Sequence, residues 1–178
     1  MPSQKPFYIF ATKLLGSYGV WKLAYYFLET KEVAQWEAFK DWTASATVHM
    51  SAWMATHIMG LNVIYNDRNI IADGTWGIFL ADHCLAIPAV VVFALFISIY
   101  AGRWQDKLWF IPFGIICIFL INSFRIAGLA YFQKYYSALF FTFVHNYVYL
   151  IFTYGLIFLM IVWWVEVFAG KDEKFIRA

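Results

Sequence analysis

The chain has 178 residues, of which 63% are hydrophobic and 22% aromatic, whereas only 13% are charged. In soluble domains about a quarter of the residues are usually charged. This composition therefore excludes a soluble globule, a disordered chain and a disulfide-rich secreted module. A net charge of +2 from 13 basic and 11 acidic residues also argues against nucleic-acid binding, because phosphates require a dense positive surface. The composition predicts a small membrane-embedded protein.

The first apolar stretch in the chain, Phe7–Leu28, is rich in aromatic residues but contains Lys13 and Lys22. A bilayer crossing needs about 20 largely apolar residues, so this stretch can cross only if the two lysines snorkel or face protein. No signal-peptide cleavage site follows it at the right distance, so we expect the stretch to remain as an anchor.

The next segment, Thr43–Asn62, has no Asp, Glu, Lys or Arg and is built mainly from Ala, Ser, Thr, Met, His and Gly. Its His49, Trp53 and His57 recur at helical spacing. We expect an amphipathic helix or one packed against other helices, and the sequence leaves open whether it crosses the membrane. A haem or metal site on the two histidines is an alternative, but no further ligand set is evident.

A short β-hairpin is predicted after this segment. Two β-prone runs flank the turn-forming sequence Asn66-Asp67-Arg68-Asn69, and a third follows: Val63–Tyr65, Ile70–Ile71 and Trp76–Leu80. We expect the hairpin to lie outside the hydrocarbon, because the open edges of a sheet cannot be satisfied in lipid.

Three stretches without charge are predicted to cross the membrane: Leu85–Gly102, Leu108–Phe124 and Tyr135–Val165. Basic residues tend to stay on the cytoplasmic side. The connection that contains Arg103 and Lys107 and the tail that contains Lys171, Lys174 and Arg177 are therefore both assigned to the cytoplasm. The hairpin, residues 82–84 and the Tyr131–Ser137 loop then lie outside.

The predicted fold is therefore an all-α polytopic membrane protein, organised as a single transmembrane domain over residues 1–178. It comprises a bundle of four to five transmembrane helices with a short extracytoplasmic β-hairpin and an amphipathic helix. Four helices cross if Thr43–Asn62 is interfacial, and five cross if it also spans the membrane.

Three side chains that can take part in catalysis are predicted to reach the outer boundary of the membrane, each from one of three consecutive helices. Cys84 starts a helix there, Arg125 ends a rise of roughly 25 Å from the cytoplasmic face, and His145 lies about ten residues into the return helix. A helix N-terminus favours the reactive thiolate of a cysteine. Cys117 lies deep inside an apolar span, so we expect it to be structural and to form no disulfide with Cys84.

Polar neighbours surround these candidates. Asn122 precedes Arg125 on the same helical face, and a buried polar pair in a membrane helix is costly enough to indicate a function. Asp82 can cap the Cys84 helix, and His83 is a second candidate base. The simpler alternatives are that Arg125 only anchors a helix end and that His145 only bonds a neighbouring helix.

The order of these motifs resembles the exosortase and archaeosortase family, which are membrane-embedded cysteine transpeptidases of bacteria and archaea. The resemblance covers about residues 62–168 and rests on three motifs: Asp82-His83-Cys84-Leu85-Ala86, Asn122-Ser123-Phe124-Arg125-Ile126, and His145. Many family members have a small residue and then Gly after the Cys, where this chain has Leu85 and Ala86. The chain looks like a compact variant, and this difference concerns substrate preference more than the type of catalysis.

The resemblance implies a reaction at the outer face of the plasma membrane, without a cofactor. Cys84 would attack the backbone carbonyl of a sorting signal, His145 would act as acid or base toward the leaving amine, and Arg125 would stabilise the oxyanion. Asn122 would orient Arg125. The acyl-enzyme would then pass to an acceptor or to water.

The implied partner is an exported protein whose C-terminal signal contains a short motif, a transmembrane helix and basic residues. The alternative from a different class is a non-catalytic membrane transport or binding protein. In that alternative Arg125 and His145 line a polar path, and Cys84 is incidental.

Overall fold

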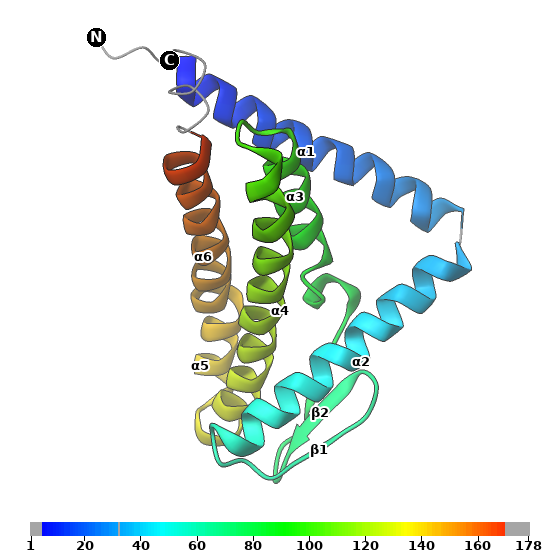
Figure 1. Cartoon of the computed structure of the whole chain (residues 1–178). Helices are drawn as coiled ribbons and strands as arrows, with labels where there is room; N and C mark the ends of the chain where they lie inside the picture. The colour runs from blue at the N-terminus through cyan, green and yellow to red at the C-terminus, as the bar shows by residue number, and fades with distance from the viewer. Residues whose placement is uncertain (1–4, 32, 170–178) are drawn as a thin grey trace. The chain divides into compact units, whose positions relative to one another are not determined.

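The computed structural model describes residues 5–31 and 33–169, so the predicted cytoplasmic residues Lys171, Lys174 and Arg177 lie outside it. The described chain is mostly helical with one small sheet, which confirms the all-α class (Figure 1). The helices are α1 (Lys5–Thr30), α2 (Ala34–His57), α3 (Ile87–Ile99), α4 (Trp104–Tyr135), α5 (Ala138–Phe143) and α6 (Tyr149–Trp163). The strands are β1 (Val63–Tyr65), β2 (Asn69–Ala72) and β3 (Ile78–Phe79).

Two helices in the described part of the chain are long and apolar enough to cross a membrane. They are α4 and a continuous helix, Ala138–Phe168, in which π-helical turns join α5 to α6 and extend α6. Helix α3 is apolar but has 13 residues, or about 20 Å at 1.5 Å per residue, against a hydrocarbon core of roughly 30 Å. The count of four to five crossings therefore stays a prediction.

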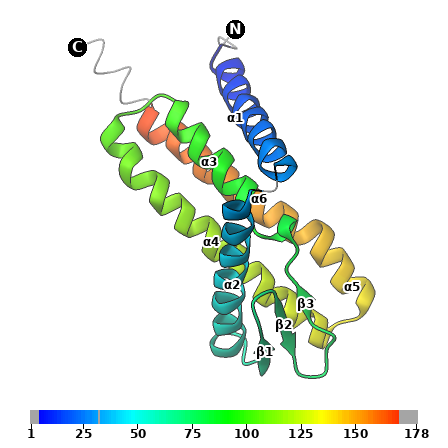
Figure 2. The same ribbon diagram turned by 90° about the vertical axis from the view of Figure 1, so that its right-hand side faces the viewer.

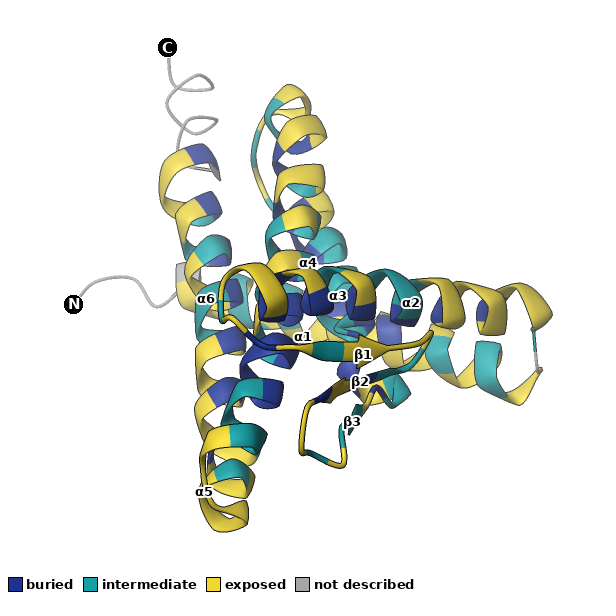
Figure 3. Ribbon diagram, turned by 90° about the horizontal axis from the view of Figure 1, so that it is seen from below, coloured by how far each residue is buried: buried dark blue, intermediate teal, exposed yellow. Residues whose placement is uncertain are grey.

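The outward surfaces of these helices are apolar. Figure 3 colours much of α5 and α6 as exposed, and Leu139 and Ile151 are 86% and 70% exposed. Large exposed aliphatic side chains suit contact with lipid, whereas a soluble protein seldom shows a wide apolar surface. This pattern agrees with a location in the membrane.

Helix α4 corrects the predicted boundaries. The expected span ended at Phe124 and a loop was expected over Tyr131–Ser137, but the helix continues to Tyr135. The polar residues near its end do not interrupt it, because Gln133 donates a hydrogen bond to the Gly77 carbonyl at 3.1 Å. Lys134 lies over the ring of Tyr135. The charge-free stretch in the sequence therefore ends before the helix does, because Gln133 and Lys134 lie in the helix and have partners there.

The contacts divide the chain into two compact units, which are described separately. One consists of residues 1–33, 87–116 and 157–178, and the other of residues 34–86 and 117–156. The first contains α1, α3, the first part of α4 and the last part of α6. The second contains α2, the sheet, the turn that carries Cys84, the second part of α4, and the chain from α5 into α6.

In the first unit, two lysines donate hydrogen bonds to backbone carbonyls at the C-terminal end of α3. Lys13 of α1 donates a hydrogen bond to the Ile99 carbonyl at 3.0 Å and lies over the Tyr100 ring. The buried Lys107 donates to the carbonyls of Ser98 and Tyr100 at 2.9 and 2.7 Å. The last carbonyls of a helix lack partners within the helix, so Lys13 faces protein, as its place in an apolar stretch requires.

In the second unit, the predicted hairpin is confirmed. Strands β1, β2 and β3 form an antiparallel sheet in that order, with Val63 opposite Ala72 and Ile70 opposite Ile78. The Asn66 side-chain oxygen accepts hydrogen bonds from the backbone nitrogens that follow it, at 3.2 and 3.0 Å, which is the local bonding that makes Asn a turn residue. The predicted third run supplies β3.

Helix α2 lies beside β1 and β2 (Figure 2). It begins at Ala34, earlier than the predicted start at Thr43, and therefore includes a charged first part. Its buried face carries small residues such as Ala44, Ala52 and Ala55. His49 and His57 lie on the exposed face, which also carries Trp53, so the amphipathic character of this helix stays a prediction.

Candidate functional site

Cys84 lies in the turn before α3 and not in the helix itself. It ends a 3₁₀ turn over Asp82–Cys84, in which its backbone nitrogen donates to the Ala81 carbonyl at 2.8 Å. Helix α3 begins at Ile87, and Pro88 suits its first turn because proline has no N–H to satisfy. The prediction that Cys84 starts the helix is therefore wrong by a few residues. The cysteine forms no disulfide and is 7% exposed.

The link between Cys84 and α3 has an unusual backbone. Ala86 has a φ of 57°, in the left-handed region, which costs a residue with a Cβ roughly 1–2 kcal/mol. It is the one non-glycine residue with a positive φ in the described chain. Such a conformation persists only where the surroundings fix the backbone.

Asn122 connects the Cys84 turn to α4. Its side-chain nitrogen donates a hydrogen bond to the Cys84 carbonyl at 2.9 Å, and its oxygen accepts one from Arg125 Nη1 at 3.4 Å. Asn122 is 1% exposed, whereas Arg125 is half-buried. The structure thus joins Cys84, Asn122 and Arg125 in one hydrogen-bonded chain.

A close contact between α4 and α6 lies next to Arg125. A Cβ on Gly128 would lie 1.8 Å from the Tyr149 hydroxyl oxygen and 3.0 Å from its Cζ. Tyr149 is 7% exposed, and the charge of Arg125 lies within electrostatic range of its hydroxyl. The sequence did not indicate Tyr149, because it is one of many aromatic residues in an apolar run; its only signal is its place one turn after His145.

His145 is oriented by its own helix. It lies in the π-helical turn Val144–Val148, a rare geometry that is frequent at functional sites. Its ring stacks on Phe141 with centroids 6.1 Å apart, and its Nδ1 lies 3.0 Å from the Asn146 side-chain oxygen. The described contacts of His145 are thus with neighbours in the chain, and the structure does not join it to Cys84 by a hydrogen bond.

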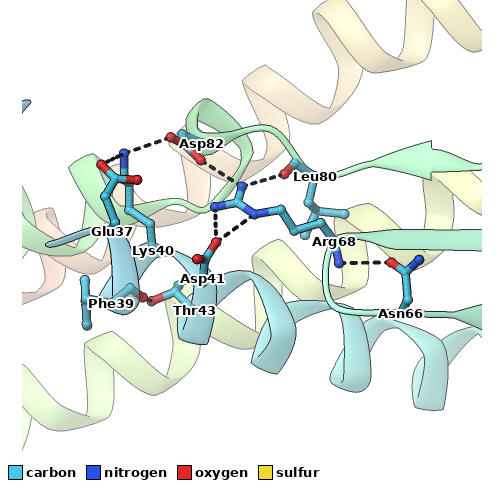
Figure 4. Close-up of polar contacts among 9 residues, drawn as sticks. All are labelled: Glu37, Phe39, Lys40, Asp41, Thr43, Asn66, Arg68, Leu80 and Asp82. Carbon is cyan, nitrogen blue, oxygen red and sulfur yellow. Dashed lines mark hydrogen bonds and ion pairs between the residues drawn. The ribbon is translucent and has the colours of Figure 1, made fainter. Parts of the chain in front are cut away.

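Asp82 is part of an ion-pair network and does not cap a helix (Figure 4). Its Oδ1 accepts a hydrogen bond from Arg68 at 2.8 Å and its Oδ2 accepts one from Lys40 at 3.0 Å. The hydrogen bond from Arg68 and the nearby positive charges hold the pKa of the Asp82 carboxyl below its usual value. The predicted helix cap is corrected accordingly, because both carboxylate oxygens have cationic partners.

The network extends from Asp82 onto α2. Arg68 also donates to the Asp41 carboxylate through Nε at 3.0 Å and through Nη2 at 2.7 Å. Hydrogen bonds to Asp82 and Asp41 raise the pKa of Arg68. Lys40 is 3% exposed and pairs with Glu37 as well, at 2.8 Å. The sequence did not indicate Lys40, Asp41 or Arg68, because the pairs Lys40–Asp82 and Arg68–Asp41 join residues that are distant in the chain.

The remaining histidines have surface positions. His83 is exposed beside Cys84. His49 and His57 each place Nδ1 against a carbonyl of the preceding helical turn, at 2.7 and 2.9 Å. Within residues 5–31 and 33–169, no group of three or more His, Cys, Asp or Glu side chains is arranged to hold a metal ion.

Comparison with known proteins identifies one family. The model of the transmembrane exosortase family matches residues 17–164, which include α2, the sheet and all of the site residues described above. The match begins in α1, well before the core of about 62–168 on which the resemblance rests. No curated protein and no solved structure matches the chain.

Proposed function

The chain belongs to the transmembrane exosortase family, and we propose that it is a membrane-embedded cysteine transpeptidase that cleaves C-terminal sorting signals of exported proteins. The observation that carries this proposal is the pair of hydrogen bonds through which Asn122 links the Cys84 carbonyl to Arg125. A buried amide placed between a free cysteine and a guanidinium supports chemistry more than simple anchoring of a helix end, since polar groups inside a membrane protein are costly.

In the proposed reaction the Cys84 thiolate attacks the backbone carbonyl carbon at the cleavage point. A C–S bond forms, the carbonyl oxygen becomes an oxyanion, and the guanidinium of Arg125 stabilises this charge. The C–N bond then breaks, and the leaving amine takes a proton from His145. An acceptor amine or water attacks the thioester, returns its proton to His145 and releases the Cys84 thiolate.

The position of each side chain suits its proposed role. Arg125 is half-buried, and a charge acts more strongly where water is excluded. The ring of His145 contacts only nearby residues of its own helix among its described partners. It can therefore turn toward a substrate without breaking a contact to another helix. Asn122 holds the nucleophile and the oxyanion donor in one orientation.

We propose that this site faces the extracytoplasmic side of the plasma membrane. Arg125 lies about 31 Å along α4 from Trp104, at 1.5 Å per residue, and this matches a hydrocarbon core of roughly 30 Å. With Arg103 at the cytoplasmic end of α4, Arg125 reaches the opposite boundary. The part of α4 beyond Arg125 then lies outside the hydrocarbon and contacts the sheet through Gln133.

The test is cleavage of an exported reporter that ends in a signal of the proposed kind, co-expressed with the full chain. We expect Cys84→Ala to abolish cleavage and Cys117→Ala, in the middle of α4, to leave it intact. An impermeant thiol reagent added outside the cell should label Cys84 and not Cys117. Continued cleavage by Cys84→Ala would overturn the proposed function and favour a non-catalytic transport or binding protein.

A further inference from the structure

The segment that leads from the sheet to Cys84 is held by Arg68. The backbone nitrogen of Leu80 donates to the Arg68 carbonyl at 2.8 Å, and Arg68 Nη1 donates back to the Leu80 carbonyl at 3.2 Å. Both polar backbone groups of Leu80 are therefore bound to the same residue. Leu80 is fully buried, so this end of the segment has a fixed position.

The same guanidinium also fixes the start of the turn that carries Cys84. Arg68 Nη1 donates to Asp82 at 2.8 Å, and Lys40 holds the other carboxylate oxygen. Arg68 is in turn oriented by Asp41 on α2. We call these four residues, Lys40, Asp41, Arg68 and Asp82, the Asp82 clamp (Figure 4).

The clamp combines rigidity with burial. The planar fork of an arginine allows several fixed hydrogen bonds at once, and here it binds two carboxylates and one carbonyl. The side chain of Lys40 is 4% exposed, and a buried ammonium is stable only when it is paired. Asp82 cannot leave this position without removing a partner from Lys40, so the clamp resists displacement of the turn.

The far end of the turn has its own anchor. Cys84 is joined to α4 through the Asn122 hydrogen bond to its carbonyl, and Ala86 then adopts its left-handed backbone. The cysteine is thus held from two sides, by Asp82 before it and by Asn122 at its own carbonyl. Both anchors precede Ala86 and fix the backbone that leads into its strained conformation.

We propose that Arg68 and Lys40 are positioning residues that act through Asp82 to hold Cys84 in its attacking position. This inference rests on the proposed function of Cys84 as the nucleophile. Neither cation touches the reacting atoms. Their role is to restrict the backbone of the turn, because a misplacement of about 1 Å in a reacting group can lower turnover about 100-fold.

The experiment measures turnover and thiol exposure in the full chain in detergent, with the exported reporter as substrate. N-ethylmaleimide alkylation of Cys84 and Cys117 is followed separately by mass spectrometry. The variants are Asp82→Asn, Arg68→Gln, Arg68→Lys and the double variant of the first two. Asp67→Asn is the control, because Asp67 is an exposed carboxylate in the turn between β1 and β2.

We expect Asp82→Asn and Arg68→Gln each to lower kcat about 100-fold, with a much smaller change in KM. Alkylation of Cys84 should become about tenfold faster because the turn opens locally, while that of Cys117 stays unchanged. The loss in the double variant should be smaller than the two single losses multiplied, because both single variants remove the Arg68–Asp82 interaction. Asp67→Asn should behave as the wild type. Arg68→Lys keeps the charge but loses the planar fork, so its kcat and its Cys84 alkylation rate should lie between those of the wild type and Arg68→Gln.

Unchanged turnover and unchanged Cys84 alkylation in Asp82→Asn would overturn the inference and leave the proposed function intact. Equal increases in the alkylation rates of Cys84 and Cys117, in both Asp82→Asn and Arg68→Lys, would also overturn it, because the clamp would then support the whole fold. The alkylation readout does not depend on catalysis. Failure of the proposed function is therefore recognised separately, by an active Cys84→Ala.

Discussion

Gly128 allows α4 and α6 to approach next to Arg125, and Gly128→Ala tests how tightly they pack. The new Cβ would lie 1.8 Å from the Tyr149 hydroxyl oxygen, whereas ordinary contacts of a Cβ begin at about 3.4 Å. Tyr149 cannot simply turn away. It is 7% exposed, and its ring packs edge-on against Phe132 with centroids 6.3 Å apart.

The expected loss follows from two opposing terms. Overpacking a close-packed site costs about 1–3 kcal/mol, and the upper end applies because the clash involves a rigid ring. Replacing a helical glycine by alanine contributes about 1 kcal/mol in the other direction. Gly128→Ala should therefore destabilise the protein by about 2 kcal/mol, which corresponds to a fall in Tm of about 4–8 °C.

The assay is thermal unfolding of the purified protein in detergent, with Gly155→Ala as the matched control. Gly155 is also helical, but a Cβ there would meet no atom within 4 Å, so its Tm should rise slightly. Adding Tyr149→Phe to Gly128→Ala removes the clashing oxygen and should restore most of the lost stability. Equal Tm values for the two alanine variants, or no rescue by Tyr149→Phe, would refute the packing described for this contact.

Three further predictions concern the residues around Cys84. Ala86→Gly should stabilise the protein by about 0.5–1 kcal/mol, because glycine adopts a left-handed backbone without strain, at the cost of some entropy. Ala89→Gly in α3 should instead destabilise it. Equal losses of stability in the two variants would show that the backbone at Ala86 is not strained. Asn122→Ala should cost about 1–3 kcal/mol in unfolding free energy, because the buried Cys84 carbonyl loses its donor, and wild-type stability would contradict this. Since the pKa of Asp82 is lowered from 3.8, its ion pairs stabilise the fold above that pH and are lost as the pH falls through the lowered value. The difference in stability between wild type and Asp82→Asn should therefore be constant from pH 5 to 8 and shrink only in strong acid; a change near neutrality would show that another group controls it.

The residues that sequence reasoning found share a local signal. The hairpin follows from β-prone runs around an Asn-rich turn, and the structure confirms it. Asn122 and Arg125 were singled out because two polar residues one turn apart interrupt an apolar helix, and the structure joins them at 3.4 Å. In both cases the interacting residues are only a few positions apart, so the pattern alone identifies them.

The clamp residues carry no such signal. Arg68 was interpreted as a turn residue, and Lys40 and Asp41 lay before the predicted helix. Their partners are far away in the chain, 27 residues for Arg68 with Asp41 and 42 for Lys40 with Asp82. Only the tertiary fold brings these charges together. A charge that marks a loop in the sequence can therefore be a buried partner, as the 3% exposure of Lys40 shows.

The hydrogen bonds of Asn122 also change the interpretation of its role. The sequence suggested that Asn122 orients Arg125, but its shorter bond, 2.9 Å, is to the Cys84 carbonyl, and its bond with Arg125 is 3.4 Å. An amide that donates to Cys84 must turn its oxygen toward Arg125, so one bond fixes the direction of the other. With Asp82 bound on the other side, the backbone around Cys84 is restricted, and the main remaining freedom of the proposed nucleophile is the rotation of its side chain. In the proposed reaction, a cysteine restricted in this way is organised for attack before the substrate arrives, which is where orientation contributes most to a rate.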